Sequence, residues 1–308
     1  MSHFLPFVCA RLIRQLSLVA LFASGIAGAS STDTAVQAPT SAPATRMASS
    51  VAQQFRLAGY TGSFVTRTSQ QLTIWHGAED AQLASSPAST FKVFLALVGL
   101  QTGALKSADE LVPWNRKPYP DRPEWQRDMA LREAMQTSSE SYFQVLAERI
   151  GRARMDSWAH KLGYGNLQLG DDPKLAWHDG VFLINSAQQA DWMHRLQLNQ
   201  LPIKPVHLKA VKKALLEPFQ SNAQVEIYSK TGTSIPRQGA GLGWWIGFVE
   251  NLQSPQLSCS FALKVNLSKI DDRQKRIAFG KKLLRQVGCL PIESTKHVCL
   301  PRFVLLET

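Results

Sequence analysis

Apolar residues in this chain follow two different patterns, which predict strands near both ends of the sequence and helices between them. Short apolar or alternating runs at residues 59–65 and 72–75 are separated by polar residues, a pattern typical of a β-hairpin. Similar strand-like runs return at residues 225–233, 243–249 and 257–265. An antiparallel sheet that contains all these strands must therefore be assembled from both ends of the chain.

The middle of the chain has the longer apolar runs that are typical of helices. The run at 93–100 follows a proline-containing segment and predicts a buried helix. Further helices are expected on both sides of a polar break at 137–141, the first of them capped by Asp128, and then within 186–218 and at about 272–287. We therefore predict an α+β fold. It combines an antiparallel sheet flanked by helices with an all-helical lobe, and an active site is expected in the cleft between them.

The N-terminal residues differ in character from the rest of the chain. Residues 1–29 have a basic start, an apolar run and a small-residue cleavage site, which together indicate a secretory signal peptide cleaved near Ala29. The apolar run falls short of the roughly 18–20 residues that span a bilayer, so export to the periplasm without stable membrane insertion is expected. Residues 30–48 are rich in Ala, Ser, Thr and Pro and predict a flexible leader. Residues 49–308 then form one catalytic domain.

The composition argues against nucleic acid and metal ions as partners. The net charge of +11 is scattered along the chain, without a dense Lys/Arg tract or a nucleic-acid-binding motif. No Cys/His cluster has the spacing of a zinc site. In an oxidising compartment Cys289 and Cys299 could close a short loop, with Cys259 free. The sequence leaves this pairing and the oligomeric state open.

Ser89 and Lys92 are the first candidates for chemistry. Ser89 is expected in the first turn of a helix, where unpaired backbone N–H groups stabilise an alkoxide or oxyanion. Lys92 lies one turn further along the same face, and burial would favour its neutral form, which can accept the serine proton. A helix-capping serine beside a surface lysine would produce the same pattern. The pair alone therefore does not establish a nucleophile.

Two further features complete a set of motifs. Ser138 lies in the polar break between two predicted helices, and Lys230-Thr231-Gly232 lies on a predicted strand. Together with Ser89 and Lys92, in this order, they match the motifs of active-site-serine β-lactamases and penicillin-binding proteins. In that chemistry one serine attacks the lactam carbonyl and a second hydroxyl relays a proton to the leaving nitrogen. The strand lysine attracts the substrate carboxylate.

Within that group the chain resembles class D, or oxacillinase-type, β-lactamases over roughly residues 55–288. The resemblance rests on Pro87-Ala88-Ser89-Thr90-Phe91-Lys92, Tyr164-Gly165-Asn166, Trp177-x-x-Gly180, Lys230-Thr231-Gly232-Thr233 and Gly243-Trp244-Trp245-Ile246-Gly247. Arg276 also lies where that family places a carboxylate-binding arginine. The resemblance implies a serine β-lactamase that hydrolyses penicillin-type substrates through an acyl-enzyme.

The resemblance further implies a role for each matched residue. Ser89 would be the acylated nucleophile, and Lys92, N-carboxylated by carbon dioxide, would be the general base in acylation and deacylation. Trp177 would stabilise that carbamate, and Ser138 would relay the proton to the leaving nitrogen. The implied substrate-binding residues are Lys230, Thr231, Gly232, Thr233 and Arg276, and the N–H groups of Ser89 and Thr233 would form the oxyanion hole. No other cofactor is implied.

Some of these residues also have plainer interpretations. Trp177 could belong to an aromatic core, and Tyr164 and Asn166 could only shape a turn. Arg276 could be a solvated residue on the final helix. These alternatives predict side chains that do not meet at one site.

Glu140 departs from the class D pattern. Where that family has Ser-x-Val, this chain has Ser138-Ser139-Glu140. Two unit charges about 4 Å apart interact by about 4 kcal/mol at an effective dielectric constant near 20, so an ionised Glu140 beside Lys92 would oppose a carbamate there. It would also hold the lysine as an ammonium ion. Three alternatives remain: Glu140 points to solvent, it is neutral, or it acts as the base for deacylation.

These observations give a leading functional hypothesis and two alternatives. The leading one is a periplasmic serine β-lactamase that takes a small-molecule β-lactam as its partner. The first alternative is a slowly deacylating penicillin-binding protein or D-alanyl-D-alanine peptidase-like acyltransferase. The second is a covalent lactam-binding module that stays acylated. The rate of deacylation separates the leading hypothesis from both alternatives.

Overall fold

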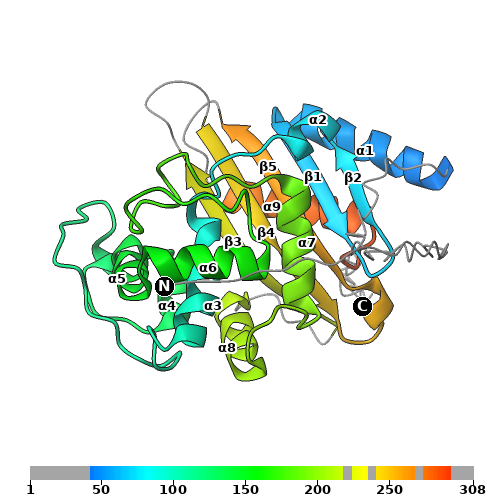
Figure 1. The fold of residues 1–308 in the computed structure, drawn as a ribbon. Coiled ribbons are helices and arrows are strands. Elements are labelled where there is room, and N and C mark those ends of the chain that lie inside the picture. Colours follow the sequence, from blue (N-terminus) through cyan, green and yellow to red (C-terminus); the bar gives the residue numbers. More distant parts are fainter. Residues whose placement is uncertain (1–41, 218–223, 235–240, 268–272, 293–308) are drawn as a thin grey trace, which may run out of the picture. The chain divides into compact units, whose positions relative to one another are not determined.

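The computed structural model describes residues 42–217, 224–234, 241–267 and 273–292. In this part of the chain, strands from both ends form one antiparallel sheet in the order β2-β1-β5-β4-β3 (Figure 1). The strands are β1 (Thr61–Arg67), β2 (Leu72–His76), β3 (Val225–Ser234), β4 (Gly241–Asn251) and β5 (Cys259–Leu267). The N-terminal hairpin therefore pairs with a C-terminal strand, as the sequence pattern predicts.

Helices cover the sheet and also form a group of their own. They are α1 (Ala42–Ala58), α2 (Ala78–Gln82), α3 (Phe91–Thr102), α4 (Leu131–Thr137), α5 (Glu140–Ile150), α6 (Arg152–Leu162), α7 (Ser186–Gln197), α8 (Pro205–Leu215) and α9 (Arg273–Gln286). Helix α7 packs on β1, β4 and β5, whereas α1 and α9 pack on each other and on the strands (Figure 1). Helices α3, α4, α5, α6 and α8 pack mainly among themselves. The predicted α+β architecture with a helical lobe is confirmed.

Strand β4 shows how the sheet separates two apolar cores. Trp244, Ile246 and Phe248 pack into the core that contains the helical group and α7. Trp245 and Val249 point the other way, into the core shared with α1 and α9. Successive side chains of a strand alternate between its faces, so a nearly continuous apolar run fills both cores. The sheet is therefore buried on both sides along this strand.

Two predicted boundaries differ from the structure. Helix α1 begins at Ala42, inside the segment 30–48 that the composition predicts to be a flexible leader, so that prediction is wrong for residues 42–48. Asp128 does not cap α4: Ala130 holds the cap position, and an Asp128 oxygen accepts a hydrogen bond from the Trp114 N–H. The predicted signal peptide at 1–29 lies outside the described residues. Among those described, no helix is long and apolar enough to span a bilayer.

The structure also contains a disulfide bond, whose pairing the sequence leaves open. Cys259, at the start of β5, is bonded to Cys289, which follows α9, and their Cα atoms are 6.0 Å apart. The sequence allows Cys289–Cys299 as one possibility; the structure pairs Cys289 with Cys259 instead, and Cys299 lies outside the described residues. The bond ties the C-terminal helix to the sheet, a contact between segments that are distant in sequence.

Candidate active site

Ser89 lies on a short turn that β3 holds in place. Residues Ala88–Thr90 form a 3₁₀ turn that leads directly into α3. Strand β3 approaches this turn so closely at Gly232 that a Cβ there would lie 2.9 Å from the Pro87 carbonyl oxygen. Only glycine fits such an approach without displacing one of the two segments. The Lys-Thr-Gly motif therefore brings the strand against the predicted nucleophile.

Lys92 is completely buried and is held by three oxygen acceptors. Its ammonium group donates to the Ser138 carbonyl at 2.8 Å, to the Glu140 Oε1 at 2.5 Å and to the Ser138 Oγ at 3.5 Å. Burial lowers the pKa of Lys92, and the neighbouring Glu140 carboxylate opposes that change. The surface-lysine interpretation is therefore wrong.

Ser138 lies between the two lysines of the motif set. It ends α4 in a left-handed conformation, with φ of 57°, so the chain turns sharply before α5 begins. Lys230 of β3 donates to the Ser138 Oγ at 2.9 Å and to the Thr231 carbonyl at 2.9 Å. One hydroxyl thus contacts Lys92 from the helical side and Lys230 from the strand side. A proton can pass between these groups through Ser138.

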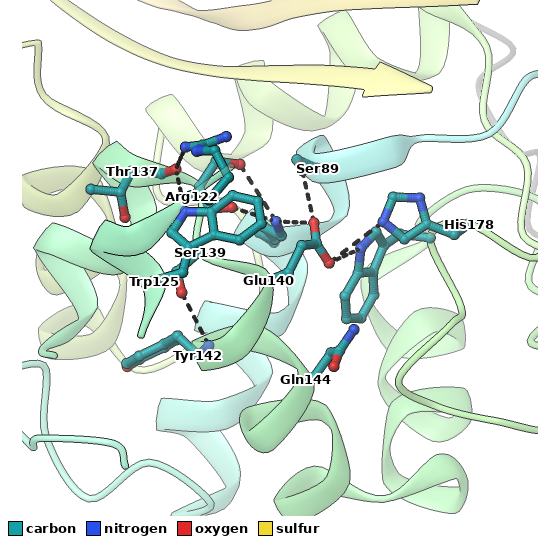
Figure 2. Close-up of polar contacts among 12 residues, drawn as sticks. Ser89, Arg122, Trp125, Thr137, Ser139, Glu140, Tyr142, Gln144 and His178 are labelled. Atoms are coloured by element: carbon teal, nitrogen blue, oxygen red, sulfur yellow. Dashed lines mark hydrogen bonds and ion pairs between the residues drawn. The ribbon is translucent and has the colours of Figure 1, made fainter. Parts of the chain in front are cut away.

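Glu140 lies at the centre of the site. It is the first residue of α5, with Ser139 as N-cap, a position where the helix dipole favours an acidic side chain. Figure 2 shows its carboxylate between Ser89 and His178. The Ser89 hydroxyl donates to Oε1 at 3.5 Å, and the Trp177 indole N–H donates to Oε2 at 3.0 Å. The side chain is 15% exposed, so Glu140 does not point to solvent.

Charge keeps Glu140 ionised. Burial alone would raise its pKa, but Lys92 and His178, whose Nε2 is 3.5 Å from Oε2, together hold the pKa of Glu140 well below its ordinary value. Of the three alternatives for this residue, the solvent-facing and the neutral one are therefore wrong. The remaining one places an ionised carboxylate beside the Ser89 hydroxyl.

Arg276 lies behind the end of β3. It is 1% exposed and donates to the Gly232 carbonyl at 2.7 Å and to the Thr233 Oγ1 at 2.9 Å. Gly243 of β4 is paired with Thr233 on the neighbouring strand, and a Cβ at Gly243 would lie 2.4 Å from the arginine Nη1. The interpretation of Arg276 as a solvated helix residue is therefore wrong. The arginine is in direct contact with the strand residues predicted to bind substrate.

The tryptophan and tyrosine motifs have different surroundings. Trp177 is completely buried, stacks on Phe91 and donates its indole N–H to Glu140. Tyr164 stacks on Phe94 in the helical core. The Asn166 side chain binds backbone groups across its turn, at Val181 and Leu183, in keeping with a turn-shaping role. Trp177 belongs to the site, whereas Tyr164 and Asn166 support it from outside.

A pocket of about 370 Å³ lies beside this cluster and includes Ser89, Ser138 and Glu140. It is lined by Ser89, Arg122, Trp125, Ser138, Glu140, His178, Thr231 and Thr233. Arg122, Trp125 and His178 were not among the residues singled out from the sequence. Arg122 and Trp125 both donate to the Thr137 carbonyl (Figure 2). Both lie in the proline-rich segment 107–128, which the sequence pattern predicts to be a surface loop. His178 directly follows the motif residue Trp177 in the sequence, and this adjacency is the feature that indicates its place in the site.

Comparisons with known proteins agree with this geometry. Residues 66–284 match the family model described as the penicillin binding protein transpeptidase domain. The sequence is 31% identical over 241 residues to β-lactamase OXA-5 of Pseudomonas aeruginosa, covering 77% of this chain and 88% of the relative.

Two solved structures are also similar. One is the class D β-lactamase YbXI from Nostoc, with a TM-score of 0.70 at 27% identity, covering 78% of this chain and 99% of that one. The other is the C-terminal domain of the Bacillus licheniformis BlaR penicillin-receptor, with a TM-score of 0.71 at 27% identity, covering 78% and 96%. The fold is therefore shared by hydrolases and by a penicillin receptor.

Proposed function

Because this chain belongs to the penicillin-binding protein transpeptidase family and is related to class D β-lactamases, we propose that it hydrolyses penicillin-type β-lactams through an acyl-enzyme on Ser89. The observation that carries this proposal is the linkage of Ser89, Lys92, Ser138 and Lys230 around one pocket. Each of these residues belongs to one of the expected motifs. The Glu140 carboxylate connects Ser89 to Lys92, and Ser138 connects Lys92 to Lys230.

In the proposed acylation, the Ser89 hydroxyl gives its proton to the Lys92–Glu140 pair and its oxygen bonds to the lactam carbonyl carbon. The carbonyl becomes an oxyanion, which the N–H groups of Ser89 and Thr233 would stabilise. As the intermediate collapses, the lactam C–N bond breaks and the nitrogen takes a proton from the Ser138 hydroxyl. The proton first removed from Ser89 returns to Ser138 through Lys92. The result is an ester on Ser89 and an opened ring.

Substrate binding is assigned to β3 and the residues behind it. A penicillin carries a carboxylate next to its lactam nitrogen, and such a group is recognised by charge-assisted hydrogen bonds. Thr231 and Thr233 line the pocket from the strand side, Lys230 contacts the pocket residue Ser138, and Arg276 contacts Thr233. We assign the carboxylate to this set.

The test is the intact mass of the protein mixed with benzylpenicillin, sampled from seconds to hours. A transient adduct on Ser89 with accumulating penicilloate is expected for a hydrolase. The Ser89→Ala variant serves as control, because it should give neither adduct nor product. If the wild-type chain forms no adduct, the proposal fails.

A covalent penicillin-binding module is the second candidate function. The similarity to a penicillin receptor favours it, together with the Lys92–Glu140 ion pair, which leaves the lysine less able to accept a proton. This candidate, like a slowly deacylating acyltransferase, predicts a lasting adduct without product. A D-alanyl-D-alanine peptide tests for the acyltransferase, since only that enzyme would release D-alanine from it. Export to the periplasm, with cleavage near Ala29, completes the proposal.

A further inference from the structure

We propose that the Glu140 carboxylate is the general base of this site, so that turnover requires no carbon dioxide. This inference rests on the proposed function and names the group that accepts the protons. Glu140 is the one residue of the expected motif set that departs from the class D pattern. In the described structure its carboxylate contacts the Ser89 hydroxyl, Lys92 and the Trp177 indole.

The geometry of Glu140 meets the first requirement of a base, which is reach. Its Oε1 is 3.5 Å from the Ser89 Oγ, and such contacts are often long before a substrate binds. The carboxylate also lines the pocket, so a water molecule that approaches an ester on Ser89 passes beside it. A single carboxylate therefore faces both the nucleophile of acylation and the space from which deacylating water arrives.

The second requirement is a fixed orientation. Both carboxylate oxygens have partners on different elements: Lys92 on α3 holds Oε1, and Trp177 and His178 face Oε2. The residue begins α5, whose N-cap Ser139 accepts a hydrogen bond from the Tyr142 N–H. These contacts fix the carboxylate without an additional ligand.

The residues present do not fit a carbamate on Lys92. The lysine Nζ already donates to three oxygens, one of them the Glu140 carboxylate at 2.5 Å. The Trp177 N–H, which the resemblance assigns to the carbamate, is used by Glu140 instead. A second carboxylate on Nζ would lie against the first in a buried setting, where like charges strongly oppose each other. Glu140 thus occupies the position and the hydrogen bonds that the modified lysine would need.

The two proton transfers balance without a further reagent. In acylation, the Ser89 hydroxyl proton moves to the Glu140 carboxylate, and Ser138 gives its own proton to the departing lactam nitrogen. The Glu140–Lys92 pair then returns one proton to Ser138. In deacylation, a water molecule gives one proton to Glu140, and its oxygen bonds to the ester carbonyl carbon. The bond from that carbon to the Ser89 oxygen then breaks, and Glu140 returns the proton to Ser89. The product is the ring-opened acid.

The first experiment uses the wild-type protein and leaves the fold untouched. Benzylpenicillin turnover is measured in carbon-dioxide-depleted buffer and again with added bicarbonate. The expected result is the same rate in both. In parallel, ¹³C NMR with labelled bicarbonate should show no carbamate carbon. A rate that rises with bicarbonate, together with a carbamate signal, would overturn the inference and leave the proposed hydrolase intact.

The second experiment removes the base and keeps the shape. Glu140→Gln retains an oxygen that can accept from Trp177 but cannot take a proton, so acylation and deacylation should both slow by about 10²- to 10⁴-fold. The Ser89 adduct should therefore form slowly and, once formed, persist. Glu148→Gln, on the same helix but 67% exposed in its side chain, is the matched control and should behave as wild type. If Glu140→Gln releases product at the wild-type rate, the inference is wrong.

Intact mass separates the possible failures. If the wild-type chain forms no adduct, the proposed function is wrong, and so is the assignment of Glu140 as general base. If the wild-type adduct persists without product, the chain is a covalent binder and Glu140 is not a deacylating base. If wild type turns over and Glu140→Gln accumulates adduct, both the function and the base are supported.

Discussion

The two sides of the pocket use lysine in contrasting ways. The helical side comprises Ser89, Lys92, Glu140 and Trp177, and its lysine is held 2.5 Å from a carboxylate and has no exposed surface. The strand side comprises the 230–233 motif with Arg276 behind it, and its lysine contacts the Ser138 hydroxyl and a backbone carbonyl. Both lysines reach Ser138, and the helical one is also paired with the Glu140 carboxylate.

The helical side would therefore transfer protons, and the strand side would bind and position the substrate. On the helical side one residue, Glu140, opposes the lowering of the Lys92 pKa by burial and contacts the Ser89 hydroxyl, so a change there alters the reaction itself. On the strand side, close backbone approach at Gly232 sets the distance between β3 and the nucleophile turn. Variants on the helical side should therefore change rates and pH profiles, and variants on the strand side should change binding and fit.

Ser89→Ala should have the largest effect, because it removes the group on which both sides converge. Loss of a serine nucleophile costs about 10⁴-fold or more in turnover, and no covalent adduct should form. Benzylpenicillin binding, measured by calorimetry, should persist, since the strand side is unchanged. Adduct formation by Ser89→Ala would show that another residue is the nucleophile.

Lys92→Met should have the next largest effect, this time on stability. Removal of Lys92 leaves the Glu140 carboxylate buried without its cation, a change that typically costs about 3–5 kcal/mol of the free energy of unfolding. The pKa of Glu140 should rise in this variant, so the folded state gains a proton more readily. The deficit should then be smaller at pH 5 than at pH 8, as measured by urea denaturation at both values.

The double variant Lys92→Met with Glu140→Leu provides the control for this cost. Replacing both members of a buried ion pair by apolar residues is often close to neutral. Most of the lost stability should therefore return, although activity should not. If the double variant is as unstable as Lys92→Met, the loss reflects packing of the lysine stem rather than the ion pair.

The sequence predicts the strand side of the site better than the helical side. Alternating apolar residues identify β3, β4 and β5, and a strand fixes the direction of each side chain by its period of two. The positions of Lys230 and Thr231 therefore follow from pattern alone. On the helical side, the direction of Glu140 depends on the left-handed turn at Ser138, a non-glycine conformation that no periodicity indicates.

Other features were beyond the sequence for a similar physical reason. Arg122 and Trp125 come from a loop, whose path is set by tertiary contacts such as their bonds to the Thr137 carbonyl. The Cys259–Cys289 bond joins residues 30 positions apart, and only the packing of α9 on the sheet brings them together. Contacts of this kind follow from the assembled fold, whereas helices and strands follow from local pattern.

Gly232→Ala should have a moderate effect and tests the strand side. The new Cβ would lie 2.9 Å from the Pro87 carbonyl oxygen, so β3 must move away from the nucleophile turn. A displacement of about 1 Å can cost about 100-fold in rate, and crowding of this kind costs about 1–3 kcal/mol of stability. Acylation rate and thermal unfolding measure the two effects.

Gly103→Ala is the matched control for Gly232→Ala. Gly103 ends α3 at φ of 74°, and a Cβ there would have no atom within 4 Å. The variant should lose about 1 kcal/mol of stability to its backbone conformation and keep the wild-type acylation rate. Equal losses of activity in both variants would mean that reduced stability, rather than the position of β3, explains the effect.

His178→Gln should have the smallest effect and acts on the helical side. His178 helps to keep the pKa of Glu140 below its ordinary value of 4.5, so its removal should raise that pKa. Glu140 must be ionised to accept a proton, so the acid limb of deacylation should move to higher pH. The His178 side chain is 38% exposed, and pairs of that kind contribute at most about 1 kcal/mol, or about 0.7 pH units.

The shift produced by His178→Gln can be measured by forming the acyl-enzyme at neutral pH and following its hydrolysis after a jump to lower pH. His160→Gln, on α6, is the control, and its limb should coincide with that of wild type. If the acid limb of the pH–rate profile does not move in His178→Gln, His178 does not contribute to the lowered pKa of Glu140.

For the wild-type protein, the rate of deacylation should not fall between pH 7 and pH 5, because the pKa of the Glu140 carboxylate is lowered. A lysine carbamate would behave differently there, because protonation releases its carbon dioxide.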